Sequence, residues 1–323
     1  MRNVGIICGG FSSEFDISVK SAKNIFNNFP SEYRPFLIIL RKDSWFVKNK
    51  DGTIMNIDSR EFSFEIDKEF IKIDLAIVFI HGDPGENGKV QSYLEMIGIP
   101  YLNSRPLASQ LSFNKWYCNQ FLRGFGFNVA KSIYLNNSSS QVDLDRIIND
   151  LGLPLFVKPS DSGSSFGIYK VNKIEDLNNA IKNAFNESSN VVLESFLDGV
   201  EITCGVYREN NEVKTLPLTE IISSNEFFDY EAKYKGLSEE ITPARISKQV
   251  AKKIEGITSE IYNLMQLRLF ARVDFIIVDG VPYVIEVNSI PGFSDESIFP
   301  KMLDVAGISI KNFLVSQIKE NLN

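Results

Sequence analysis

The sequence has very few of the side chains on which zinc sites and disulfide frameworks depend. Its 323 residues include one histidine, His81, and three cysteines, Cys8, Cys118 and Cys204, which lie far apart in the chain. Zinc sites use closely spaced cysteines and histidines, and disulfide-rich domains use even sets of cysteines. The sequence therefore excludes a histidine-rich metal site, and we expect the three cysteines to be reduced, semi-buried thiols.

Long apolar runs and basic clusters are also absent. No apolar run approaches the roughly 20 residues of a membrane span, and the first ten residues form a strand pattern broken by Gly9 and Gly10, without a signal-peptide cleavage site. The 34 Lys and Arg and 41 Asp and Glu residues give a net charge of −7 and form no basic patch. We therefore expect a cytoplasmic protein whose partners are small molecules, not nucleic acids or membranes.

The apolar residues that are present can form two or three domain cores, because 44% of the chain is hydrophobic and 12% is aromatic. Apolar runs at 4–8, 35–40 and 75–80 alternate with a helical pattern that begins near Ile17. This alternation predicts a parallel sheet covered by helices, with ligands at the carboxyl ends of its strands. A hairpin that turns at residues 50–52 is inserted into this unit.

The rest of the chain predicts a mixed α and β structure. We expect one long helix over residues 106–125, then a strand, a Ser/Gly loop, a strand and a helix within 151–184, and longer strands from Val191. A helix over 246–264, a hairpin over 268–288 and two terminal helices complete the pattern. The polar stretch 223–243 lacks a regular pattern, and loops of this length are usually functional or disordered, so we expect a mobile lid.

The predicted hairpin over 268–288 carries two acidic residues that we expect to face each other. If its loop consists of residues 279–281, Asp274 lies opposite Glu286 and Arg272 lies opposite Asn288, all on one face. The other face is then a core face, formed by Val273, Phe275, Ile277, Ile285 and Val287. A two-residue loop would instead turn Glu286 to the opposite face.

Directly opposed carboxylates repel each other unless a cation lies between them. Asp, Glu and Asn oxygens together with phosphate oxygens are a typical ligand set for Mg²⁺. The hairpin therefore favours a magnesium site, and the alternative is a solvated polar face on which Arg272 neutralises both acids.

The stretch "KPSDSGSSFGI", residues 158–168, follows a short apolar strand. A Ser/Gly loop offers backbone N–H groups and hydroxyls, and Lys158 adds a positive charge, which together suit a polyphosphate. The P-loop pattern GxxxxGK[ST] is absent. Together with a magnesium-binding face, the loop points to ATP.

Several motifs in this order resemble the ATP-grasp enzymes: "KPSDSGSSFGI", "VVLESFLDGVE", "FFDYEAKYKG", "ARVDF" and "VIEVNSIPGF". The stretches "GGFSSEFDIS", "HGDPGENGKVQSYLEMIGIPY" and "FDYEAKY" resemble the D-alanine:D-alanine ligases in particular. The resemblance extends from Gly9 to about Gly307. It implies a three-domain ATP-grasp architecture: an N-terminal Rossmann-like substrate domain over 1–103, a central subdomain over 104–190, and a C-terminal subdomain over 191–323 that carries the mobile loop 223–243.

The resemblance also implies a reaction. In such ligases ATP phosphorylates the carboxylate of one D-alanine, and the amine of a second D-alanine attacks the acylphosphate to give the dipeptide that enters peptidoglycan synthesis. It further implies Mg²⁺ or Mn²⁺ as cofactor and a homodimer.

The roles that the resemblance assigns to single residues fall into two groups. The nucleotide and metal group has phosphate-binding Lys115, Lys158 and Lys233, the adenine-binding stretch Glu194, Ser195, Phe196 and Leu197, the ribose-binding Glu201, and the metal ligands Asp274, Glu286 and Asn288, of which Asn288 also faces the nucleotide. The substrate group has Glu14 for the ammonium of the first D-alanine, His81 for its carboxylate, Arg272 and the Gly292 N–H for the oxyanion, Ser297 and Ile298 for the second carboxylate, and the hydrogen-bonded triad Glu14, Ser164 and Tyr234.

Functions other than a dipeptide ligase fit the sequence less well. Retention of Tyr234 favours D-alanine as second substrate, but D-serine, D-lactate and other carboxylate–amine ligations stay open. An ATP-binding regulatory domain without turnover is disfavoured by the complete set of Arg272, Asp274, Glu286 and Asn288. A nucleotide-binding dehydrogenase is excluded because "CGGFSSEF" lacks the GxGxxG pattern.

Overall fold

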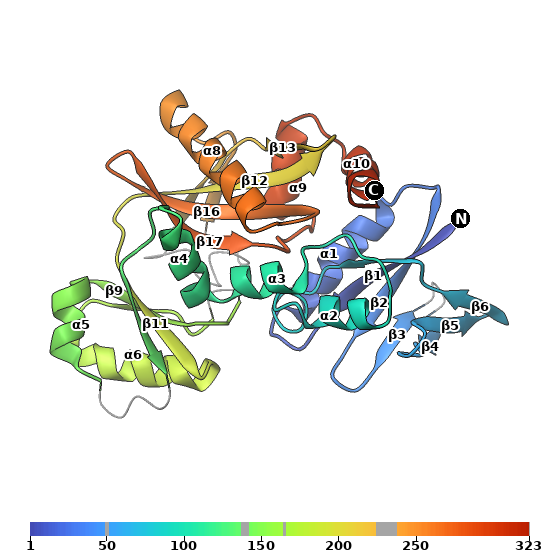
Figure 1. Ribbon diagram of the computed structural model, residues 1–323, viewed down its shortest axis with the longest axis horizontal. Helices are drawn as coiled ribbons and strands as arrows, with labels where there is room; N and C mark the ends of the chain where they lie inside the picture. Colours follow the sequence, from blue (N-terminus) through green and yellow to red (C-terminus); the bar gives the residue numbers. More distant parts are fainter. Residues whose placement is uncertain (49–51, 137–141, 164–165, 224–237, 323) are drawn as a thin grey trace.

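The computed structural model describes residues 1–48, 52–136, 142–163, 166–223 and 238–322, and it has the predicted mixed α/β fold (Figure 1). Three antiparallel or mixed sheets of four to six strands and one small hairpin account for its strands. Among the described residues, none of the helices has the length and apolar character needed to cross a membrane.

The N-terminal sheet has the strand order β4-β3-β2-β1-β7, in which β1 pairs in parallel with β2 and β7. Its strands are β1 (Arg2–Gly9), β2 (Tyr33–Leu40), β3 (Trp45–Lys48), β4 (Ile54–Asn56) and β7 (Leu75–Val78). Helix α1 (Phe15–Asn27) packs on β1 and β2, and α2 (Lys89–Met96) follows β7. The parallel unit and its inserted β3–β4 hairpin are as predicted, whereas the hairpin of β5 (Ser63–Ile66) and β6 (Glu69–Lys72) was not foreseen.

The central sheet is antiparallel, with the order β10-β9-β11-β8. It consists of β8 (Ser132–Asn136), β9 (Leu155–Pro159), β10 (Tyr169–Val171) and β11 (Asn190–Ser195), and α5 (Leu144–Leu151) and α6 (Ile174–Glu187) complete its layer. Alternate apolar residues of β9 and β11 meet the buried side of α6 in a separate cluster. This arrangement leaves the Ser/Gly loop between β9 and β10 at the edge of the unit.

The C-terminal sheet has the order β15-β14-β12-β16-β17, with β13 paired to β12. Its strands are β12 (Val200–Glu209), β13 (Glu212–Thr215), β14 (Thr219–Ser223), β15 (Ser238–Ile241), β16 (Phe270–Val278) and β17 (Val281–Asn288). Helix α8 (Lys248–Leu264) packs on one face through the side of β12 that carries Cys204, while α9 (Ile298–Val305) and α10 (Ile310–Leu322) meet the other face at Gly205 and Tyr207.

The predicted lid over 223–243 begins and ends in paired strands. Ser223 of β14 pairs with Ser238 of β15, so residues 238–241 form a strand where no regular pattern was expected. Residues 224–237, including Lys233 and Tyr234, lie outside the described part of the chain.

The single helix predicted over 106–125 is wrong, because the structure has two. Helix α3 (Pro106–Phe113) ends before Asn114, and α4 (Lys115–Gly124) begins after it. Asn114 has extended backbone angles, and its side chain accepts a hydrogen bond from the N–H of Tyr117, as an N-cap does. The break places Lys115 at the first turn of α4.

The β16–β17 hairpin has the predicted pairing of Asp274 with Glu286, but its loop length differs from the one expected. Its loop is the two residues Asp279 and Gly280, both with positive φ, and not the three residues expected. A β-bulge between Asp274 and Phe275 leaves Ile285 as the extra residue, and the register shifts by one. The bulge therefore returns Glu286 to the position opposite Asp274, and Val284 takes the core position expected for Ile285.

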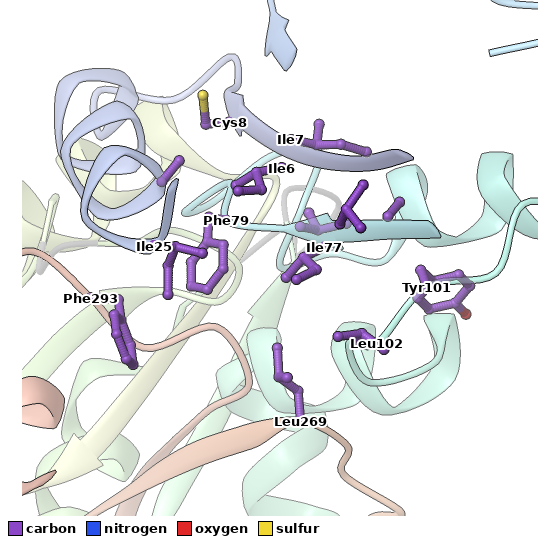
Figure 2. Close-up of a cluster of buried hydrophobic side chains, with 14 of the residues drawn as sticks. Ile6, Ile7, Cys8, Ile25, Ile77, Phe79, Tyr101, Leu102, Leu269 and Phe293 are labelled. Carbon is purple, nitrogen blue, oxygen red and sulfur yellow. The ribbon is translucent and has the colours of Figure 1, made fainter. Parts of the chain in front are cut away.

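The largest apolar cluster joins the two ends of the chain. Ile25 and Phe79 of the N-terminal unit lie close to Phe293, and Leu102 lies near Leu269 (Figure 2). Phe270, Phe299 and Phe313 extend this cluster toward α9 and α10. By contrast, α3 and α4 contribute their buried residues to the cluster of the C-terminal sheet. The division into three domains stays a prediction.

Candidate active site

The polar end of the C-terminal sheet is organised around Asp274. Arg272 donates to both oxygens of Asp274, at 2.9 and 3.0 Å, the Asn288 side-chain amide donates at 2.9 Å, and the Thr203 hydroxyl donates at 2.5 Å. These residues share a face because residues two apart on a strand point the same way. Farther along the same face, Tyr207 and Phe270 are apolar and buried, so the polar group lies beside a rigid core.

Glu286 faces this group from β17 and has its own cationic neighbour. The Lys115 ammonium lies 3.7 Å from Glu286 Oε1 and donates to the carbonyl of Ser162 at 2.6 Å. The backbone N–H of Lys115 also donates to the carbonyl of Ser160 at 2.7 Å. The first turn of α4 is thereby attached to the Ser/Gly loop, and each of the two opposed acids is next to a positive charge.

Asp274, Glu286 and Asn288 are suitable ligands for a magnesium ion, but the oxygens of Asp274 are already engaged in hydrogen bonds. Carboxylate and amide oxygens from Asp274, Glu286 and Asn288 are hard donors of the kind that Mg²⁺ prefers. Both oxygens of Asp274 accept hydrogen bonds from Arg272 and neighbouring side chains, so a dication there must displace at least one of these donors. Among the described residues, no larger group of Asp, Glu, His or Cys converges at one point.

A second charged group lies at the end of β11. The Lys158 ammonium contacts Glu194 Oε2 at 2.5 Å, and the Asn119 side-chain amide donates to Glu194 Oε1 at 2.6 Å. Both charged side chains are almost fully buried, so their pairing offsets the desolvation of each. Phe196 follows β11 and lies 6.1 Å from Phe156, ring centre to ring centre. Ser195 ends β11, and Leu197 follows Phe196.

Glu14 lies beyond the carboxyl end of β1 and is buried. It approaches the Ser/Gly loop so closely that a Cβ atom at Gly163 would overlap its carboxylate. The loop predicted to hold phosphates thus lies against the residue predicted to bind an ammonium. Ser164, the second member of the expected triad, lies outside the described residues, as do Lys233 and Tyr234.

Glu86, in the loop after β7, is an acid that sequence reasoning did not single out. Its Oε2 accepts a hydrogen bond from the N–H of Gly82 at 2.7 Å. Burial, reinforced by the charge of nearby Glu14, raises the pKa of the Glu86 carboxyl to about 8, with a further contribution from Glu286. Its place in "HGDPGENG", between two glycines of a quoted motif, was the available signal.

His81 is buried next to the same loop, and protein groups occupy both of its ring nitrogens. Nδ1 lies 3.0 Å from the carbonyl of Ile290, and Nε2 lies 3.2 Å from the Ser21 hydroxyl. Burial lowers the pKa of His81 and so favours the neutral ring. Contact of His81 with a substrate carboxylate stays a prediction.

The turn after β17 carries the remaining expected residues. Gly292 lies close enough to Ser297 that a Cβ at Gly292 would be 3.0 Å from the serine oxygen. Ser297 precedes α9, where its hydroxyl accepts from the N–H of Ser294 at 2.9 Å, and Ile298 is the buried first residue of the helix. Glu201 lies on β12, paired with Ile276 and Ile221.

The structure therefore brings most of the predicted residues into one region. Arg272 and Glu14 both contribute to the electrostatic environment of His81, and Lys115 and Glu286 contribute to that of Glu86. Most of the residues that sequence reasoning missed have hydrogen-bond partners far away in the chain: Ser21, Asn24, Asn114, Asn119 and Thr203. No local pattern identifies such residues.

Comparison with known proteins agrees with this arrangement. Two family models match the chain, one described as D-ala D-ala ligase N-terminus over residues 3–104 and one described as D-ala D-ala ligase C-terminus over residues 121–319. Together they span all three sheets that contribute to the site.

Full-length relatives and solved structures give the same family. The chain is 44% identical to the D-alanine--D-alanine ligase of Azobacteroides pseudotrichonymphae over 322 residues, which cover 99% of each chain. The structure of D-alanyl-alanine synthetase A from Vibrio cholerae matches with a TM-score of 0.88 and 31% identity, covering 99% of this chain and 98% of that one. VanG D-Ala:D-Ser ligase from Enterococcus faecalis matches with a TM-score of 0.87 and 29% identity, covering 98% of each. This chain belongs to the D-alanine–D-alanine ligase family.

Proposed function

We propose that this protein uses ATP to join two molecules of D-alanine into D-alanyl-D-alanine, with ADP and phosphate as the other products. The observation that carries the proposal is the opposed pair Asp274 and Glu286 on the hairpin, with Arg272 on the same face. A bare carboxylate is a poor electrophile, so a phosphoryl group must activate it before an amine can attack. Catalysis of this kind depends on positioning and on charge stabilisation.

The nucleotide lies between the central and C-terminal sheets in this proposal. Lys158 and Lys115 bind its phosphates from the start of the Ser/Gly loop and the first turn of α4, and Lys233 approaches the terminal phosphate. Glu194, with Ser195, Phe196 and Leu197, binds the adenine, and Glu201 binds the ribose. The buried Lys158–Glu194 pair supports this role, because phosphate oxygens can replace a carboxylate as the partner of the lysine.

Asp274, Glu286 and Asn288 would hold Mg²⁺ or Mn²⁺ on this face. The metal would neutralise phosphate charge and polarise the transferring phosphoryl group. Arg272 must then exchange Asp274 for the reacting carboxylate, and Lys115 must exchange Glu286 for phosphate. The ion pairs of the present structure keep these acids neutralised until the nucleotide arrives.

The two amino acids bind on the other side of the nucleotide phosphates. Glu14 binds the ammonium of the first D-alanine, Arg272 and the Gly292 N–H stabilise the oxyanion, and Ser297 and Ile298 bind the second carboxylate. Donors placed at a developing oxyanion each contribute roughly a hundredfold or more in rate. Ser164 and Tyr234 complete the hydrogen-bonded triad of Glu14 in this proposal.

Cellular context is part of the same proposal. The dipeptide would serve peptidoglycan precursor synthesis in the cytoplasm, where ATP is available. We also expect the protein to form a homodimer. Light scattering after size-exclusion chromatography would measure its oligomeric state.

Phosphate release by the purified protein tests the function. We expect release with ATP, Mg²⁺ and D-alanine alone, and none with L-alanine. D-Serine and D-lactate should not increase release when each is added to D-alanine. Release that requires one of these second substrates would assign the chain to a different acceptor, and release independent of any amino acid would refute the ligase.

A further inference from the structure

Two buried polar residues of α1 contact the turn that contains Gly292, although they lie some 270 residues away in sequence. The N–H of Phe293 donates to the Ser21 hydroxyl at 3.0 Å, and the Asn24 side-chain amide donates to the carbonyl of Phe293 at 2.9 Å. Ser21 is fully buried and Asn24 is nearly so. Buried polar groups are costly unless they are bonded, so these contacts define the position of Phe293.

His81 completes the same network from the other side of the turn. A carbonyl can only accept, so the Nδ1 atom of His81 must carry the proton that is donated to Ile290. Nε2 of the neutral ring is then an acceptor, and the Ser21 hydroxyl donates to it. Ser21 can do so because its oxygen accepts the Phe293 N–H while its own proton remains available.

The result is a chain of bonds that fixes the backbone on both sides of Gly292. Ile290, two residues before Gly292, is held through its carbonyl, and Phe293, directly after it, is held through both its N–H and its carbonyl. The ring of Phe293 is fully buried and lies 6.1 Å from Phe79 and 5.1 Å from Phe270. Little freedom is left to the peptide group between these anchors.

We propose that Ser21 and Asn24 are positioning residues for the reaction, because they hold the 290–293 turn so that the Gly292 N–H keeps its place as an oxyanion donor. The inference rests on the proposed function, since the oxyanion belongs to that reaction. The residues touch no substrate themselves. A donor displaced by about 1 Å can cost up to a hundredfold in rate, so losing one anchor while the others remain should cost about tenfold.

The test compares Ser21→Ala and Asn24→Ala with a matched control, Ser18→Ala. Ser18 lies one turn earlier on α1, is equally buried and is bonded to Gly9 and Phe79 of the N-terminal sheet, not to the 290–293 turn. We expect kcat to fall about tenfold in both test variants, with KM for ATP unchanged. Ser18→Ala should lower thermal stability and leave kcat close to that of the wild-type protein. An equal loss of kcat in all three variants would overturn the proposal.

A spectroscopic measurement separates this inference from the proposed function. His81 is the only histidine of the chain, so ¹⁵N-histidine labelling gives one imidazole whose tautomer is read directly. We expect a protonated Nδ1 and an Nε2 signal that changes in Ser21→Ala and stays unchanged in Ser18→Ala. An Nε2 signal unaffected by Ser21→Ala would refute the network even if D-alanine is turned over. A wild-type protein without turnover would refute the function and, with it, the positioning role, and the His81 signals would then show separately whether the network itself is present.

Discussion

At the scale of single residues, each of the two opposed acids of the site has a cationic partner. Asp274 is bonded by Arg272, and Glu286 lies near Lys115, so each acid is paired with a cation to which the proposed function assigns another partner. Removing one member of a buried pair leaves an uncompensated charge. Conservative substitutions that keep shape and remove charge are therefore the informative ones.

The first prediction concerns Glu286. Glu286→Gln should lower kcat by at least about a hundredfold, because loss of metal-assisted charge stabilisation costs several kcal/mol, while the melting temperature changes little. The control is Asp279→Asn, the same chemical change in the exposed turn of the same hairpin, at a positive φ that asparagine tolerates. Phosphate release measures both, and unaltered turnover in Glu286→Gln would remove the metal argument.

A second prediction follows from the raised pKa of Glu86. In the folded protein its carboxyl has a pKa of about 8, against an ordinary value of 4.5, so between these pH values the folded state binds the extra proton. Stability must then fall as pH rises through this window. Glu86→Gln lacks the titration, so its melting temperature relative to wild type should rise from pH 5 to pH 8. Parallel pH profiles for the two proteins would contradict this.

Residue-level chemistry was predictable where motif and spacing coincide. Asp274, Glu286, Asn288 and Arg272 form one face as the alternation of a hairpin requires. Ser21 and Asn24 were not predictable, because folding alone brings their hydrogen-bond partners near. The raised pKa of Glu86 was not predictable either, because it depends in part on the charges of Glu14 and Glu286, which are distant in the sequence.

At the scale of elements, two local irregularities determine where residues of the site lie: the β-bulge at Ile285 and the helix break at Asn114. A regular two-residue hairpin would have turned Glu286 toward the core, and the bulge at Ile285 prevents this. Sequence alone gave the right pairing from the wrong loop length, because neither the bulge nor the turn type can be recognised without the partner strand. Similarly, Asn114 is only mildly unfavourable inside a helix, and its capping role depends on its surroundings, including a bond from the Ser160 hydroxyl at 2.9 Å.

A third prediction tests the break between α3 and α4. Asn114→Ala removes the cap and the acceptor for Ser160, which should cost about 1–2 kcal/mol of unfolding free energy. Because Lys115 follows directly, we also expect a higher KM for ATP. Both quantities are measured by denaturant unfolding and by steady-state kinetics.

Asp143→Ala is the matched control for this prediction. Asp143 caps α5, in the central unit, by accepting from the N–H of Arg146 at 3.0 Å, and it is exposed. The Asp143→Ala variant should lose about 1 kcal/mol of unfolding free energy without any change in the KM for ATP. A similar rise in KM for both variants would mean that general destabilisation, not the position of Lys115, is responsible.

At the scale of the whole molecule, the site is assembled from all three sheets. The N-terminal unit contributes Glu14 and His81, the central unit contributes Lys158 and Glu194, and the C-terminal unit contributes the acidic pair. The parallel N-terminal sheet followed from the alternation of apolar runs. The mutual packing of distant segments did not, since apolar periodicity says which face is buried but not against what.

The fourth prediction follows from this assembly. A ligand that contacts several units and binds only the folded state should raise the melting temperature. At a hundred times its Kd it adds about 2.7 kcal/mol to the free energy of unfolding. We expect ATP with Mg²⁺ to do so, and ATP with EDTA to do so much less. Differential scanning calorimetry measures the shift, and equal shifts with and without EDTA would argue against a metal between nucleotide and protein.

The apolar cluster shared by β1, β7, α9 and α10 also bears on biosynthesis. A ribosome delivers the N-terminal sheet first, but Phe293, Phe299 and Phe313, which cover part of its interior, emerge only after all three sheets have been made. Until then the nascent polypeptide exposes the uncovered apolar face of this sheet, and exposed apolar surface promotes aggregation. Completion of the N-terminal core therefore waits for α9 and α10, and a stop codon shortly before these helices would leave a chain unable to close its first core.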